Sequence, residues 1–454
     1  MDTTLTTWVA KEQQRLLTDL TAWLGIPSIS TQPEHKADCR RAHAWIAERL
    51  AGLGFRTETI ETEGHPMLWA VGPEVPEAPT VLCYGHYDVQ PPDPLSEWVS
   101  PPFVPTVRGG NLYARGTADD KGQVFCVVAS IEALLKTRGR LPVNMRFLIE
   151  GEEEVGSGGL TKFLTAQPDR TKADAVLVPD VNMVAPGWPS VDAGLRGLVS
   201  AEIHLRTLKK DLHSGIYGGA APNALETLFH LLERLKGPDG HINIPGLYTR
   251  VKKPTAKELK AWKALPIKEA AFRKEAGAKA LTGERQFSFL ERVWSRPTFE
   301  IHGIVGGYIG AGSKTVIPAE ATAKVTLRLV PDQRGKEVAA LLVKAVKKLA
   351  PKYADVTVTI HAYGDPVMTP LDSKPYALLD RACREIWTRG IAPIRSGGSI
   401  PIVPLLRQRK APVLCAGIGL PDDGLHGPNE KLTLDQLWKG IRLFARWLEL
   451  MGAS

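Results

Sequence analysis

The sequence predicts an α/β protein with a mostly parallel central sheet flanked by helices, and with a smaller α+β domain inserted into it. Short apolar runs typical of buried strands alternate with amphipathic helices in residues 5–178. This pattern favours parallel strands that are covered on both faces. From residue 198 onward the strands alternate apolar and polar residues, which is typical of a sheet with one exposed face. The 454 residues are enough for two or three domains.

The elements of the first domain follow from periodicity and from helix-breaking residues. Leu16, Leu20 and Leu24 lie at helical spacing, and Pro27 ends that helix. A second helix, at 36–53, stops before Gly54. The other elements expected here are strands at 55–62, 67–71, 81–84, 145–149 and 175–178, and helices at 123–135 and 158–166.

The inserted part begins where the pattern changes, near residues 194–197. Its expected elements are strands at 198–206, 298–302, 322–330 and 356–362, helices at 222–236 and 335–349, and polar helices within 250–292. A helix at 373–388, a strand at 412–416 and a helix at 434–450 then return the chain to the first domain. We therefore expect one domain from 1–195 with 364–454, and a second from 196–363.

The composition is that of an ordinary globular protein, with 43% hydrophobic and 23% charged residues. The net charge of +8 comes from Lys and Arg spread along the chain. No nucleic-acid motif accompanies that charge, so we expect no nucleic-acid partner. The five cysteines are odd in number and widely spaced, which favours reduced thiols. No apolar run approaches membrane-spanning length, and the first residues lack a secretory pattern, so we expect no membrane partner and a cytoplasmic location.

Polar residues gather around the strand at 81–84. His86 and Asp88 follow it directly, and residues two apart point the same way in an extended chain. A carboxylate beside an imidazole is a common arrangement for a metal-binding histidine. Asp119 and Asp120 lie in a glycine-flanked turn before the helix at 123–135. Two acids there are as well explained by favourable contact with the helix dipole as by metal binding.

Three further strands end in residues of the same kind. Glu152, Glu153 and Glu154 follow the strand at 145–149, Asp180 follows 175–178, and His426 lies beyond 412–416. Asp174 is an alternative to Asp180 as a ligand, but it lies at the beginning of the strand and so at the end away from the expected site. In open α/β sheets ligands bind beyond the carboxyl ends of the strands. Two histidines with several carboxylates and no cysteine are suited to Zn or a similar divalent ion.

These motifs together resemble the M20 family of di-zinc metallopeptidases, which includes dipeptidases, carboxypeptidases, aminoacylases and desuccinylases. The resemblance rests on residues 86–91, 115–122, 153–157 and 426–430, and it covers nearly the whole chain. Each motif is weak alone, and jointly they are specific. The resemblance implies a catalytic domain, and a smaller lid and dimerisation domain with the order β-α-β-β-α-β.

The resemblance also implies roles for individual residues. The metal ligands are His86, Asp119, Glu154, Asp180 and His426. Asp119 matches the carboxylate that bridges both ions, although from the residues alone Asp120 is an alternative. Asp88 orients His86. The family pattern Glu-Glu-x-Gly-Ser aligns Glu153 as the general base and leaves Glu152 as an extra, solvated acid. The family also has a cis peptide bond after the bridging residue, so we expect one between Asp119 and Asp120.

Further roles implied by the resemblance fall mostly in the inserted domain. His213, which by itself indicates only an exposed loop histidine, would reach the active site of a partner subunit and stabilise the oxyanion. Arg328 would grip a substrate carboxylate, since the guanidinium fork suits that group. Asn223, Thr315 and Ser399 are weaker candidates for substrate contact.

The expected function is therefore the metal-dependent hydrolysis of a peptide bond in dipeptides or short peptides with a free carboxyl terminus. Two divalent ions per subunit are implied, with Zn favoured over Mn or Co, and a homodimer is expected. The sequence leaves two alternatives, an N-acyl-amino-acid deacylase or desuccinylase of the same family, and a catalytically silent binding protein.

Overall fold

A computed structural model of the chain describes residues 3–396, 403–407 and 411–454. The chain divides into two compact units. The first consists of Met1–Ala193, Thr369–Ile394 and Pro401–Ser454, and the second of Gly194–Met368 with Arg395–Ile400. Each unit has a hydrophobic core of its own.

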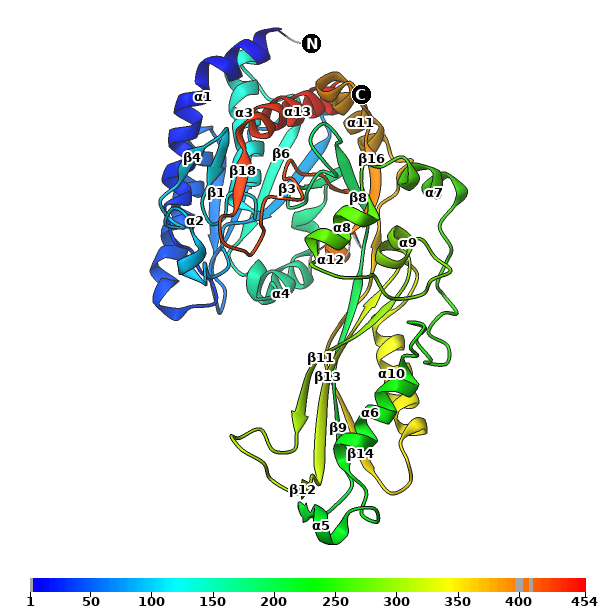
Figure 1. Cartoon of the computed structure of the whole chain (residues 1–454). Helices are drawn as coiled ribbons and strands as arrows, with labels where there is room; N and C mark the ends of the chain where they lie inside the picture. The colour runs from blue at the N-terminus through cyan, green and yellow to red at the C-terminus, as the bar shows by residue number, and fades with distance from the viewer. Residues whose placement is uncertain (1–2, 397–402, 408–410) are drawn as a thin grey trace. The chain divides into compact units, whose positions relative to one another are not determined.

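A six-stranded sheet forms the centre of the first unit (Figure 1). In spatial order its strands are β1 (Arg56–Ile60), β2 (Met67–Val71), β6 (Asn144–Glu150), β3 (Thr80–His86), β7 (Ala175–Val178) and β17 (Val413–Cys415). The last four strands run parallel to one another, while β1 and β2 are antiparallel at one edge. The prediction of an α/β fold with a mostly parallel sheet is confirmed.

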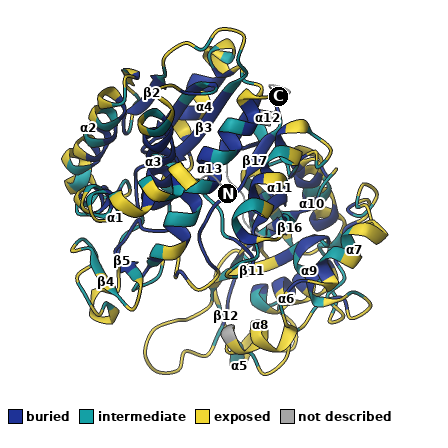
Figure 2. Cartoon of the chain, turned by 90° about the horizontal axis from the view of Figure 1, so that it is seen from above, coloured by how far each residue is buried: buried dark blue, intermediate teal, exposed yellow. Residues whose placement is uncertain are grey.

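The parallel strands are apolar because both faces of the sheet are covered. Every residue of β7 is buried, as is β3 from Val81 to His86, and Figure 2 shows β3 and β17 in dark blue. The helices of this unit are α1 (Thr3–Leu24), α2 (Lys36–Gly52), α3 (Lys121–Arg138), α4 (Gly158–Ala166), α11 (Lys374–Trp387), α12 (Val403–Arg407) and α13 (Leu434–Gly452). Helix α3 packs against α1 and α13, and it is buried from Lys121 to Leu134.

Short strands that periodicity did not predict bring distant segments together. A three-stranded sheet has the order β18 (Lys431–Thr433), β5 (Asn111–Tyr113) and β4 (Thr106–Arg108). Three residues are too few to show a period, so only the tertiary pairing reveals them. The pairing of β18 with β5 places the loop around residue 426 beside the turn at 115–120. Strands β8 (Ser190–Leu195), β15 (Val367–Met368) and β16 (Ala392–Ser396) were not predicted either.

The second unit contains an antiparallel four-stranded sheet, in the order β11 (Thr298–Gly306), β13 (Glu320–Leu329), β9 (Gly197–Arg206) and β14 (Asp355–Gly364). Buried residues alternate with half-buried ones along β9 and β13, as expected of a sheet covered on one face. The other elements are β10 (Leu212–His213), β12 (Val316–Ile317), α5 (Ser214–Tyr217), α6 (Ala224–Leu235), α7 (Ala256–Lys263), α8 (Glu269–Glu275), α9 (Phe289–Trp294) and α10 (Gly335–Leu349). The chain order β9-α6-β11-β13-α10-β14 is the predicted β-α-β-β-α-β. In the part of the chain that the structure describes, no helix is both long and apolar enough to cross a membrane.

Candidate metal centre

The carboxyl ends of the parallel strands meet at one edge of the sheet. Strand β3 ends at His86, which pairs with Glu150 at the end of β6. Asp180 follows β7 by two residues. The sequence predicted a strand at 81–84, but β3 continues through Gly85 to His86. A side chain at Gly85 would collide with Val124 and with the carboxylate of Asp120, so glycine provides space here.

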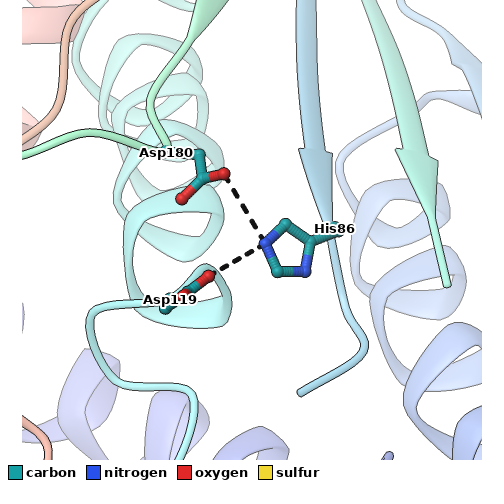
Figure 3. A group of neighbouring side chains, drawn as sticks. All are labelled: His86, Asp119 and Asp180. Carbon is teal, nitrogen blue, oxygen red and sulfur yellow. Dashed lines mark ion pairs between the residues drawn. The ribbon is translucent and has the colours of Figure 1, made fainter. Parts of the chain in front are cut away.

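One group of candidate ligands surrounds His86. The side chains of His86, Asp119 and Asp180 point toward one another, from the end of β3, the turn before α3 and the loop after β7 (Figure 3). The Nε2 atom of His86 lies 3.0 Å from Oδ1 of Asp119 and 3.7 Å from Oδ2 of Asp180. This nitrogen is buried and makes no hydrogen bond to any described residue. A buried nitrogen without a hydrogen bond, facing two carboxylates, is the arrangement that a bound cation would satisfy.

A second group lies on the other side of Asp119. Nε2 of His426 is 2.9 Å from Oδ2 of Asp119 and 3.5 Å from Oε2 of Glu154. In each group all the candidate ligand atoms lie within 4.8 Å of one another. Asp119 therefore directs one carboxylate oxygen to each group. The second group is the more open one, since the His426 side chain is 58% exposed and the His86 side chain 0%.

Asp120, the alternative to Asp119, belongs to neither group. Its buried carboxylate accepts a hydrogen bond from the backbone N–H of His86, at 3.1 Å. The peptide bond between Asp119 and Asp120 is cis, as the resemblance predicted. Asp174, the alternative to Asp180, accepts a hydrogen bond from the backbone N–H of Thr80 at the start of β3.

Asp88 lies directly behind His86. Its backbone carbonyl is 3.0 Å from Nδ1 of His86, while its carboxylate oxygen Oδ1 is 3.4 Å from the same atom. The carboxylate also accepts hydrogen bonds from the backbone N–H groups of Glu153 and Glu154, at 3.3 and 3.1 Å. Asp88 thus contacts both the histidine and the acidic segment, and the second of these contacts was not predicted.

The acidic segment after β6 contains three consecutive glutamates, Glu152, Glu153 and Glu154, whose side chains have different surroundings. Oε2 of Glu154 accepts a hydrogen bond from Nε2 of Gln90 at 2.7 Å, which orients it toward His426. Glu152 was expected to be solvated but is half-buried, and its carboxylate accepts a hydrogen bond from the hydroxyl of Thr62. Burial raises the pKa of Glu153 to about 8, against the opposing effect of His86. The three side chains therefore occupy three different environments.

The electrostatics of the cluster suit added cations. Burial, followed by the charge of Asp119, raises the pKa of Glu154 to about 7. Hydrogen bonding to Asp119 raises the pKa of His426 to about 9. The crowded acids and histidines thus retain protons that divalent ions would replace on binding. Imidazole nitrogens with carboxylate oxygens form a donor set that Zn and similar ions accept, so the residues present fit the implied metal.

Glu150 is a buried residue next to the site for which no role was predicted from the sequence. One of its oxygens accepts hydrogen bonds from the hydroxyls of Tyr84, at 2.7 Å, and Ser157, at 2.8 Å. Burial raises its pKa to about 8. Its position at the end of β6 could have indicated a place near the site, because functional groups lie at the carboxyl ends of strands in such sheets.

The remaining predicted residues belong to the second unit. His213 is exposed at the end of β10, and its Nδ1 accepts a hydrogen bond from the backbone N–H of Gly215 at 3.0 Å. An accepting Nδ1 leaves the proton of a neutral imidazole on Nε2, which is then a donor. Asn223 is the N-cap of α6, and its side-chain oxygen accepts from the N–H of Leu225. That contact gives Asn223 an ordinary structural role.

Thr315 and Arg328 lie on two different parts of the same unit. Thr315 is exposed, and its carbonyl accepts a hydrogen bond from the N–H of Ser214. Arg328 is half-buried on β13, between its strand partners Leu198 and Thr298. Ser399 lies outside the residues that the structure describes.

The chain is similar to proteins of one known family. Residues 82–450 match the model of peptidase family M20/M25/M40. The chain is 31% identical to a Cys-Gly metallodipeptidase of Schizosaccharomyces pombe, with 98% of both chains covered. It is 29% identical to the human Beta-Ala-His dipeptidase, over 96% of this chain and 90% of the relative.

Solved structures show the same likeness in three dimensions. An M20 family metallo-carboxypeptidase from Sulfolobus solfataricus superimposes with a TM-score of 0.85 at 30% identity, covering 97% of this chain and 99% of the other. The family match spans more than half of the chain and includes all five candidate ligands. The chain therefore belongs to peptidase family M20/M25/M40.

Proposed function

We propose that this protein is a metal-dependent dipeptidase that cleaves dipeptides or short peptides with a free carboxyl terminus. The observation that carries this proposal is the pair of ligand groups sharing Asp119, with the half-buried Glu153 next to Glu154 in the sequence. The named relatives are dipeptidases and a carboxypeptidase, which favours peptide hydrolysis over deacylation or a silent binding role.

Two divalent ions are proposed, one for each group. His86 and Asp180 would hold the first, His426 and Glu154 the second, and Asp119 would contribute to both. Zn suits this set of nitrogen and oxygen donors, with Mn or Co as alternatives. Bound divalent ions lower the pKa of water and polarise a carbonyl group, which is the chemistry that amide hydrolysis requires.

Glu153 is the proposed general base. Its amide is held by the carboxylate of Asp88, so the backbone that carries it is fixed relative to His86. A carboxyl whose pKa is raised by burial binds a proton more strongly than an exposed one, which suits a group that takes and then returns a proton. Glu153 would take a proton from the attacking water and deliver it to the leaving amine.

A homodimer is proposed as the catalytic unit. Beyond Phe299, strand β11 carries exposed residues on both faces, among them Ile301, Ile304 and Val305. The strand is also an edge of its sheet, and edges with apolar side chains favour pairing with another chain. In such a dimer His213 would donate from Nε2 to the oxyanion in the partner subunit's site.

Arg328 is proposed to bind the substrate carboxylate, with Thr315, Asn223 and Ser399 as further contacts. The guanidinium group of Arg328 offers paired donors that match a carboxylate. A cytoplasmic location is also proposed, supported by five free cysteines that are all buried.

The decisive experiment is a panel of dipeptides and N-acyl-amino acids, tested before and after chelation. We expect dipeptides to be cleaved, chelation to abolish cleavage and added Zn, Mn or Co to restore it. Full activity in metal-free protein would contradict the mechanism. Faster turnover of N-acyl-amino acids than of any dipeptide would assign the deacylase activity instead.

A further inference from the structure

The two ends of the metal centre come from distant parts of the chain. Asp119 and His426 are separated by 307 positions, yet their side chains lie 2.9 Å apart. Neither backbone segment belongs to the six-stranded sheet. The pairing of β18 with β5 brings the two segments together, and the buried carboxylate of Glu430 is hydrogen-bonded across them.

Glu430 is fully buried, four residues after His426. Its Oε2 accepts hydrogen bonds from Nη1 of Arg115 at 2.7 Å and from the N–H of Gly116 at 2.9 Å. Its Oε1 accepts from the N–H groups of Ala118 at 2.8 Å and Asp119 at 3.1 Å. An ionised carboxylate has about four lone-pair sites, so these four donors use its full capacity. All four donors come from the turn that ends in Asp119.

Arg115 extends the connection to the histidine. This side chain is 1% exposed, and its Nη2 donates to the carbonyl oxygen of His426 at 3.1 Å and to that of Pro91 at 3.2 Å. The ion pair of Arg115 with Glu430 is thus hydrogen-bonded to the backbone of Asp119 on one side and of His426 on the other. The hydrogen bonds that the described structure gives this pair to Asp119 and His426 use only backbone atoms of those residues, so they leave the ligand side chains available to a metal.

We infer that Glu430 is the positioning residue of the metal centre, acting through Arg115 and the 116–119 turn to fix Asp119 and His426 relative to each other. The inference rests on the proposed metal site. A purely stabilising role is the alternative, but a buried ion pair contributes little net stability compared with apolar residues of the same size. The convergence of four donors from one turn instead favours a role in geometry.

The substitution that tests this is Glu430→Gln. Glutamine has nearly the same shape but replaces one oxygen with an NH2 group, which would face two N–H donors and accept from neither. The matched control is Glu132→Gln. Glu132 is 6% exposed and accepts hydrogen bonds from Arg15, at 2.9 Å, and from Arg49. It lies in helix α3, which follows the Asp119 turn, eleven residues after the first residue of that helix. That spacing corresponds to about 16 Å along the helix axis.

The measurement is Zn²⁺ binding to the full-length chain by calorimetry after chelation, together with thermal unfolding of the metal-free protein. We expect Glu430→Gln to weaken Zn²⁺ binding roughly 10–100-fold, the range seen when an outer hydrogen-bond partner of a metal ligand is lost. Turnover should fall at limiting Zn²⁺ and recover largely at saturating Zn²⁺. Glu132→Gln should lower the unfolding temperature yet bind Zn²⁺ like the wild type.

Arg115→Lys provides a second variant should Glu430→Gln fail to fold. Lysine keeps the positive charge but has one ammonium group where arginine has a fork, so it cannot hold Glu430 and the His426 carbonyl in the same way. We expect weaker Zn²⁺ binding from this variant too. Wild-type affinity in both variants, or equal loss in Glu132→Gln, would overturn the inference. If the wild-type chain itself binds no Zn²⁺, the proposed function fails instead.

Discussion

In the first unit the candidate ligands gather beyond the carboxyl ends of the parallel strands, where both faces of the sheet are covered and His86 has no exposed surface. In the second unit the polar candidates lie along or beside antiparallel strands, and His213 and Thr315 are exposed. Among the described residues, both groups of candidate metal ligands belong to the first unit.

The difference follows from what each task requires. Binding an ion through buried imidazole and carboxylate groups requires a rigid, desolvated frame, which a sheet buried on both faces supplies. Contacting a substrate or a partner subunit requires side chains that reach outward, which a sheet with one exposed face supplies. The comparison predicts that changes in the first unit affect the metal or the chemistry, and that changes in the second affect substrate binding or turnover without affecting the metal.

The largest effect is expected from Glu153→Gln, in the first unit. Removing the proposed general base should lower kcat roughly 10²–10⁴-fold, because water is then no longer deprotonated by the protein. Metal content, measured by elemental analysis, should stay at the wild-type value. A variant that retains wild-type turnover would remove Glu153 from the mechanism and reopen the register of the acidic segment.

In the second unit, His213→Ala should lower kcat roughly 10²–10³-fold, as the loss of an oxyanion donor does. Zn²⁺ affinity should not change, because the candidate ligands found among the described residues all belong to the first unit. Mixing His213→Ala with Glu153→Gln should restore part of the activity, since one site of a mixed dimer keeps both residues. Mixed dimers without activity would exclude a role in the partner subunit.

The stability of the metal-free protein should depend on pH through the first unit. The folded state raises the pKa of Glu153 to about 8, of Glu154 to about 7 and of His426 to about 9. The folded protein therefore binds more protons than the unfolded chain in this range, and its stability decreases as pH rises. Lys121 acts in the opposite direction, because burial lowers its pKa to about 7. As pH rises, Lys121 loses its proton in the folded state before it does in the unfolded chain. Its titration therefore increases the stability of the folded protein above about pH 7.

We therefore expect the unfolding temperature of metal-free protein to fall between about pH 5.5 and 7, measured by scanning calorimetry. Bound Zn²⁺ should remove or reverse this trend, because metal binding replaces the protons. An unfolding temperature that rises over this interval in metal-free protein would show that the acidic cluster does not retain its protons.

The smallest effect is expected from Glu152→Gln. Its carboxylate is bonded to Thr62 and is in neither ligand group. Glutamine keeps an oxygen acceptor for that hydroxyl, so kcat and metal content should stay within about twofold of the wild type, in line with the modest worth of a single hydrogen bond. A loss as large as that expected for Glu153→Gln would mean that Glu152 is the base.

Much of the fold could be predicted because most helices, and most strands of four or more residues, carry a period or an apolar run within their own residues. Strands β2 and β7, and helices α4 and α10, have the bounds that the periodicity predicted. Strands β5 and β18 have three residues each and could not be found in this way. Their pairing depends on contacts between segments more than 300 positions apart, which no local pattern encodes.

The sequence by itself determined which residue types follow the strands, and so which residues are candidates for the metal centre. It left Asp119 and Asp120 as alternatives, because neighbours in a glycine-flanked turn have no distinguishing period. The tertiary structure alone decided that Asp119 faces both His86 and His426, while Asp120 bonds the backbone of His86. It also decided that Glu430 bonds the Asp119 turn. The physical reason is that hydrogen bonds and side-chain directions depend on where distant backbone segments meet, and burial of the core sets that meeting point.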